Sequence, residues 1–142
     1  MRSTLFSLLL VATPMAVAAP PPVKVERATI PWLPGWVPHP AYLHITNTGE
    51  RAIQLTGASS REFARIEFHA ADDGDLITLE KARMPIEIRP GRSHTFGPGG
   101  PRLMLFVQND WLEPGDEAEI ALEFAGFDPL PVTFTVRKES PY

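Results

Sequence analysis

The sequence predicts an all-β protein built as an antiparallel Greek-key β-sandwich. After residue 19, no window of 11 residues has a convincing helical periodicity. Instead, about nine or ten short alternating or apolar runs recur roughly every 8–12 residues, with glycine and proline turns between them. The chain contains no internal repeat, low-complexity tract or linker. We therefore expect a single domain.

The N-terminal segment has the three parts of a secretory signal peptide. Arg2 is the only charged residue among the first 23, and Leu5 to Val17 is mostly apolar. Ala16-Val17-Ala18 provides a small-x-small cleavage site, and the apolar run is shorter than the ~20 residues of a membrane helix. We expect residues 1–19 to be removed, leaving residues 20–142 as a periplasmic domain without a membrane span.

The composition excludes several classes of protein. The chain has no cysteine, which rules out disulfides, thiolate nucleophiles and zinc–cysteine sites. A net charge of −4 without a basic cluster argues against nucleic-acid binding. The sequence also lacks a phosphate-binding loop, a dinucleotide glycine pattern, a G-x-S-x-G elbow and an H-E-x-x-H helix. Together these observations predict a protein that is not an enzyme.

The first predicted strand and the loop after it are set by alternation and by proline. Val23 to Ile30 alternates and is typical of a strand. Residues 31–40 contain four prolines, which exclude a helix or a central strand, so an ordered loop is expected. Trp32 and Trp36 in this loop either pack across an open end of the sandwich or contact a partner.

The remaining strands are predicted from the same alternation and from turn residues. In the segment 63–69, Ile66 and Phe68 are expected to face inward, with Glu67 and His69 facing outward. All the further predicted strands span residues 41–46, 52–57, 63–69, 76–79, 85–89, 93–96, 103–107, 117–124 and 131–137.

A sharp turn at Pro98-Gly99-Gly100 precedes one of the most apolar of these strands. Alternation places Arg102 and Met104 on one face of that strand, and Leu103 and Leu105 on the other. A thioether beside such a turn is either core filler or a ligand for a soft metal ion.

Histidine and methionine are the residues with the clearest chemical potential. Four histidines are present, His39, His44, His69 and His94, and after signal removal the only methionines are Met84 and Met104. Imidazole and thioether together favour Cu(I). For any one of these residues, a surface histidine or a core methionine is the simpler interpretation.

The order of these landmarks resembles the periplasmic copper chaperone family PCu(A)C. The matching segments are Ala41 to Gly49, Phe63-Ala64, Glu67-Phe68-His69, Ile86 to Gly91, Pro98-Gly99-Gly100, Leu103-Met104-Leu105 and Leu112 to Asp116. The resemblance implies a cupredoxin-like β-sandwich that binds Cu(I). It also implies a partner that is a cytochrome oxidase subunit, supplied with copper for its Cu(A) centre, or another copper-handling protein. We expect the chain to act as a monomer.

The resemblance also implies a ligand set, two of whose positions are altered. His69 and Met104 occupy the positions of the family's first histidine and last methionine. The intermediate methionine falls at or near Leu79, and the second histidine falls on Arg102. Leucine has no donor atom, and arginine has a permanent positive charge and no available lone pair.

Three outcomes for copper remain open at this point, together with a different function. The site is rebuilt with His94 or Met84, or it is a weakened pair of His69 and Met104, or high-affinity copper binding is lost. The alternative function is a non-metal binding or interaction module, in which Arg102 and the Trp32/Trp36 loop contact a partner.

Overall fold

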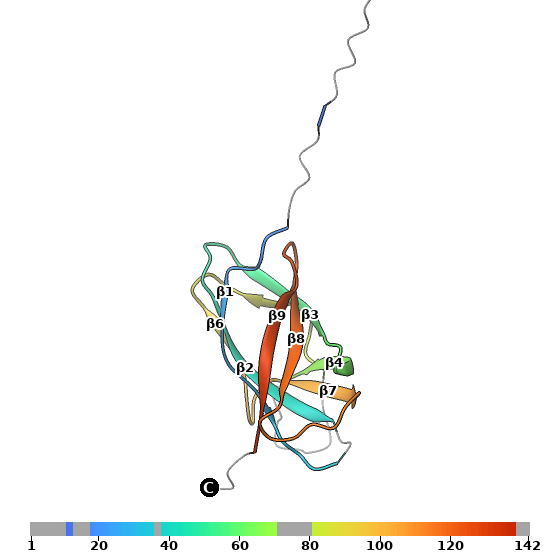
Figure 1. Ribbon diagram of the computed structural model, residues 1–142. Helices are drawn as coiled ribbons and strands as arrows, with labels where there is room; N and C mark the ends of the chain where they lie inside the picture. The colour runs from blue at the N-terminus through green and yellow to red at the C-terminus, as the bar shows by residue number, and fades with distance from the viewer. Residues whose placement is uncertain (1–10, 13–17, 36–37, 71–80, 139–142) are drawn as a thin grey trace, which may run out of the picture.

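The computed structural model describes residues 11–12, 18–35, 38–70 and 81–138, and all regular structure within them is β-strand (Figure 1). No helix in this described part is long and apolar enough to cross a membrane. The strands are β1 (Val23–Pro31), β2 (His39–Asn47), β3 (Ile53–Ser59), β4 (Phe63–His69), β5 (Ile86–Ile88), β6 (Ser93–Phe96), β7 (Arg102–Gln108), β8 (Glu117–Phe124) and β9 (Leu130–Arg137).

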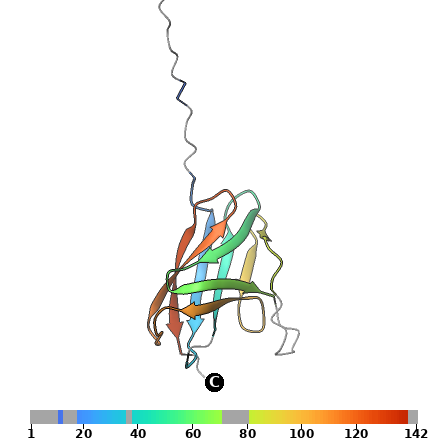
Figure 2. The same cartoon turned by 90° about the vertical axis from the view of Figure 1, so that its right-hand side faces the viewer.

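One strand, β2, joins the two layers of the sandwich. Its first residues, His39 to Ala41, pair with β7, whereas Leu43 to Thr46 pair with β6. The complete order is β4-β7-β2-β1-β9-β8-β3-β5, with β6 beside β2. The sheet therefore curls over itself, and Figure 2 shows β4 and β7 lying across the front of the upright strands β1, β2 and β9. This architecture confirms the predicted all-β, cupredoxin-like sandwich.

The core fills the space between these layers with alternate side chains of the strands. Leu43 and Ile45 of β2 and Leu103 and Leu105 of β7 are each at most 1% exposed. They belong to one contiguous cluster of buried hydrophobic residues that reaches Phe134 of β9. Leu103 and Leu105 occupy the core face of β7, so the alternate residues Arg102 and Met104 lie on its outer face.

Two details differ from the sequence prediction. The pairing of β1 with β9 is parallel, so the sheet is not antiparallel throughout. β2 begins at His39, inside the segment predicted as a loop. Pro40 is tolerated there because residues 39–41 pair with β7, while pairing with β1 begins only at Tyr42. The predicted strand 76–79 lies outside the described residues.

Turn residues shape two of the connections between strands, and neither connection is a hairpin, because β2 does not pair with β3 and β6 does not pair with β7. Asn47 is fully buried and donates from Nδ2 to the carbonyl oxygens of Arg51 and Ile88, at 2.7 and 2.9 Å. Its Oδ1 accepts from the Gly49 amide at 2.9 Å. At the turn before β7, Gly99 has φ of 73°, which favours glycine. This turn sets where β7 begins and therefore where its side chains lie.

Candidate metal site

The strand register brings His69 and Met104 onto the same face of the β4–β7 pair. His69 lies opposite Arg102, and Glu67 lies opposite Met104. Directly opposed residues point to the same side of a sheet, and alternate residues along a strand do so too. The predicted split of β7, with Arg102 and Met104 on one face, follows from this register.

The rings of His69 and Phe106 approach each other along this face. His69 is paired with Arg102, yet its ring centroid lies 6.5 Å from that of Phe106, farther along β7. Met104 lies between Arg102 and Phe106 on the same face. His69 and Met104 therefore lie on the same face of neighbouring strands.

Both side chains are buried although they do not face the core. Met104 is 9% exposed, and it is the single buried hydrophobic residue of the described chain that is not part of the contiguous core cluster. His69 is only 3% exposed. It lies on the outward face of the strand as predicted, but it does not contact solvent as a surface histidine would. The side chain does leave the core face, but it is shielded from solvent.

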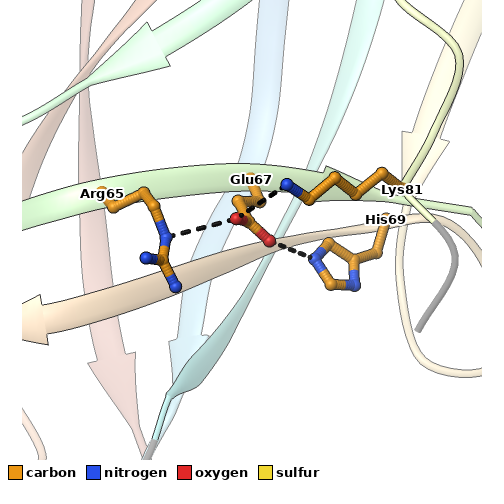
Figure 3. A network of polar contacts seen from close by, with 4 residues as sticks. All are labelled: Arg65, Glu67, His69 and Lys81. Atoms are coloured by element: carbon orange, nitrogen blue, oxygen red, sulfur yellow. Dashed lines mark hydrogen bonds and ion pairs between the residues drawn. The ribbon is translucent and has the colours of Figure 1, made fainter. Parts of the chain in front are cut away.

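A carboxylate holds the His69 ring in place. Glu67 Oε2 lies 3.0 Å from His69 Nε2, and Glu67 Oε1 lies 3.2 Å from both Arg65 Nε and Lys81 Nζ (Figure 3). The guanidinium of Arg65 also covers the ring of Phe106, 4.3 Å from its centroid. Figure 3 shows the Glu67 carboxylate at the centre of these contacts.

These contacts decide which nitrogen of His69 carries a proton. The hydrogen bond from His69 makes the largest contribution to a lowered pKa of the Glu67 carboxyl; burial opposes it, and Lys81 and Arg65 add to it. An ionised carboxylate only accepts hydrogen bonds, so Nε2 of His69 must donate. His69 Nδ1 is buried and has no hydrogen-bond partner among the described residues. It is the nitrogen available to a metal ion.

The other predicted ligands lie elsewhere or outside the described residues. Met84 is 40% exposed and lines a groove of about 260 Å³ together with Glu67 and Lys81, on the side of β4 toward β3. Leu79 falls outside the described part of the chain. No group of three or more His, Cys, Asp or Glu side chains in the described part could hold a metal ion.

His94 lies on the core side of β6, away from the face that carries His69. It pairs with the buried Ile45, and its ring contacts that of Phe96 edge-on at 4.6 Å. Phe96 in turn packs on Phe68, at 5.6 Å between ring centroids. Because Phe68 and His69 alternate on β4, His94 approaches the face opposite to His69.

Burial of His94 predicts a pH dependence of stability. Desolvation lowers the pKa of His94 below its ordinary value, so the unfolded chain binds its proton more readily than the folded one. The wild type should lose stability as pH falls through the unfolded pKa, about 6.5. His94→Gln should show a smaller loss between pH 7.5 and 5.5 in urea unfolding. Equal slopes in the two proteins would contradict this prediction.

Two further side chains, Trp32 and His39, lie at or near the hydrophobic core. The indole of Trp32 is partly buried, packs against the core and donates from Nε1 to the Leu112 carbonyl at 3.0 Å. This contact favours packing as its role, and Trp36 lies outside the described residues. His39 is 2% exposed, on the face of Leu105. Sequence reasoning did not identify this histidine as buried, because its neighbours are prolines.

The comparisons with known proteins give the family of the chain. A family model described as "Putative lipoprotein LpqE-like" matches residues 13–136. The chain belongs to the LpqE-like family. This LpqE-like chain is also 28% identical, over 102 residues, to the uncharacterized protein RP573 of Rickettsia prowazekii (strain Madrid E). The match covers 71% of the chain and 56% of that relative, so the chain spans little more than half of its length.

Solved structures support the fold of this LpqE-like protein. The copper-bound PCuAC domain from PmoF2 has 23% sequence identity and a TM-score of 0.71, covering 88% of this chain and all of that domain. The solution structure of CuI-DR1885 from Deinococcus radiodurans has 23% identity and a TM-score of 0.62, covering 87% of this chain and 83% of that one. These matches confirm the PCu(A)C-like fold expected from the sequence.

Proposed function

We propose that this protein is a periplasmic, chaperone-like Cu(I)-binding protein that holds the ion between His69 Nδ1 and Met104 Sδ. The observation that carries the proposal is the pairing of an unpartnered, buried imidazole nitrogen with a methionine that is buried outside the core. Imidazole and thioether suit Cu(I). The copper-bound PCuAC domain and CuI-DR1885, which share this fold, support the choice of ion.

The site is a weakened version of the one that the family resemblance implies. Arg102 lies opposite His69, where that resemblance places a second histidine. Its charge repels a copper ion, and it offers no lone pair. If each missing ligand costs about 1–3 kcal/mol, two losses reduce affinity by roughly 30- to 25,000-fold. We propose that a weak site of this kind releases Cu(I) by ligand exchange to a copper-handling partner, such as a cytochrome oxidase subunit.

Cu(I) binding tests the proposal directly. Titration under anaerobic conditions against a chromophoric Cu(I) chelator should show one retained ion per chain. His69→Ala and Met104→Leu should each weaken binding by roughly 5- to 150-fold, corresponding to about 1–3 kcal/mol for one lost ligand. Met104→Leu conserves side-chain volume, which limits its effect on folding.

His44→Ala is the matched control, because His44 is a strand histidine that bonds Thr95 Oγ1 at 2.7 Å on another part of the sheet. It should leave the affinity unchanged. No copper retained by the wild type, or equal retention in His69→Ala, would contradict the proposal. In that case capture of a periplasmic partner that is lost in Arg102→Ala would favour the non-metal interaction module.

We also propose that residues 1–19 are a signal peptide and that residues 20–142 act as a monomeric periplasmic domain. Support comes from the charged, apolar and small-residue parts of the N-terminal segment. Expression of the full chain in a Gram-negative host, with N-terminal sequencing of the periplasmic product, should give a chain beginning at or near Pro20. A product that keeps Arg2 and stays in the cytoplasm would contradict it.

A further inference from the structure

We propose that Glu67 is the positioning residue of the copper site: it fixes the ring of His69 so that Nδ1, and not Nε2, binds Cu(I). The inference rests on the proposed function, since it concerns the atom through which His69 binds copper. It adds a residue that is not itself a ligand and that the ligand spacing in the sequence does not indicate.

The hydrogen bond between Glu67 and His69 has only one direction. Glu67 Oε2 is 3.0 Å from His69 Nε2, and an ionised carboxylate has no proton to give. Nε2 therefore keeps its hydrogen, which blocks its lone pair from a metal ion. In the neutral ring, Nδ1 is then the nitrogen with the lone pair, and it is buried without a hydrogen-bond partner in the described residues.

The other carboxylate oxygen keeps Glu67 from acting as a ligand. Oε1 is held by Arg65 Nε and Lys81 Nζ, each at 3.2 Å. Figure 3 shows these two cations on the carboxylate, with the His69 ring at its other oxygen. A carboxylate held by two cations is a poor donor to a positive ion, but it remains a good acceptor for the imidazole N–H. Glu67 can therefore act on copper only through His69.

Glu67 is well placed on β4 to hold the ring of His69. Glu67 lies opposite Met104 in the β4–β7 register, and its side chain is only 16% exposed. The bond to Glu67 holds the His69 ring on the face that also carries Met104. Metal-binding histidines commonly donate their second N–H to a carboxylate in this way, and loss of such a partner typically weakens metal binding about 10- to 100-fold.

The test combines Cu(I) affinity with nuclear magnetic resonance of the His69 ring. In the metal-free wild type, His69 should show a slowly exchanging Nε2–H proton, and Cu(I) should shift the ¹⁵N resonance of Nδ1 while that proton stays. Glu67→Ala should lose the slow exchange and bind Cu(I) roughly 10- to 100-fold more weakly. Glu67→Gln, which keeps an acceptor oxygen without the charge, should restore part of both.

Glu87→Ala is the matched control, because Glu87 of β5 accepts from Gln54 and pairs with Arg89, and among the described residues it contacts no histidine. It should change neither measurement. A merely structural role for Glu67 would lower the melting temperature and leave the bound nitrogen and the affinity of folded protein unchanged. That result, or Cu(I) bound through Nε2, would overturn the inference.

The outcomes also separate this inference from the proposed function. If the wild type binds no Cu(I), the function fails, and the metal-free Nε2–H signal still reports the orientation set by Glu67. If the wild type binds Cu(I) and Glu67→Ala binds it equally well, the positioning role fails and the function stands.

Discussion

Arg102→His should tighten Cu(I) binding by roughly 5- to 150-fold, corresponding to about 1–3 kcal/mol for one additional ligand. Residue 102 lies directly opposite His69 on the face that also carries Met104. A histidine there places a second imidazole beside the first and removes a permanent positive charge. Both changes favour a bound cation.

The gain must be separated from the simple loss of charge. Arg102→Gln removes the charge and supplies only an amide, which is a poor ligand for Cu(I). We expect a small gain for this variant, and a clearly larger one for Arg102→His, in the same chelator competition. Equal affinities for the two variants would show that residue 102 cannot reach the ion.

Leu103→Ala should destabilise the folded protein by about 2–5 kcal/mol, because the removed atoms leave a cavity in a closely packed interior. Leu103 is fully buried and lies between Phe68 of β4 and Ala41 of β2. It therefore joins the β4–β7 layer to the rest of the core. For a domain of this size we expect the melting temperature to fall by on the order of 10 °C.

Leu33→Ala is the matched control for this loss, since Leu33 is 38% exposed in the loop before β2. The same change there should cost well under about 1 kcal/mol. Leu103 lies on the face of β7 opposite to Met104, so folded Leu103→Ala should keep its Cu(I) affinity. Urea unfolding and chelator competition measure the two effects separately. A small loss of stability would mean that the core closes around the missing atoms.

Local sequence patterns were sufficient to predict most of the strands and the residues that share one face of β7. The segment 63–69 and the segment 117–124 were predicted with their observed bounds, because the first alternates from Ile66 on, the second alternates acidic with apolar residues, and turn residues follow both. The same alternation placed Arg102 and Met104 together on β7. These are properties of a chain over a few residues, and the period of a strand is fixed by backbone geometry.

Other features depended on contacts between distant segments. The start of β2 at His39, within a run of prolines, was missed because the pairing with β7 decides it. The parallel pairing of β1 with β9 joins segments about a hundred residues apart, and no local pattern specifies it. The burial of His69 was missed for the same reason: alternation indicates a face but does not indicate what covers it.

By itself, the sequence determined an all-β domain without cysteine, and its resemblance to the PCu(A)C family singled out His69 and Met104 as candidate soft ligands. Only the tertiary structure decided that these two residues share one face of neighbouring strands, since the register of β4 with β7 is a long-range property. It also decided that Met104 is buried outside the core and that Glu67 occupies Nε2 of His69. The physical reason is that residue type gives the chemistry of a donor atom, whereas packing and hydrogen bonding determine whether that atom is available.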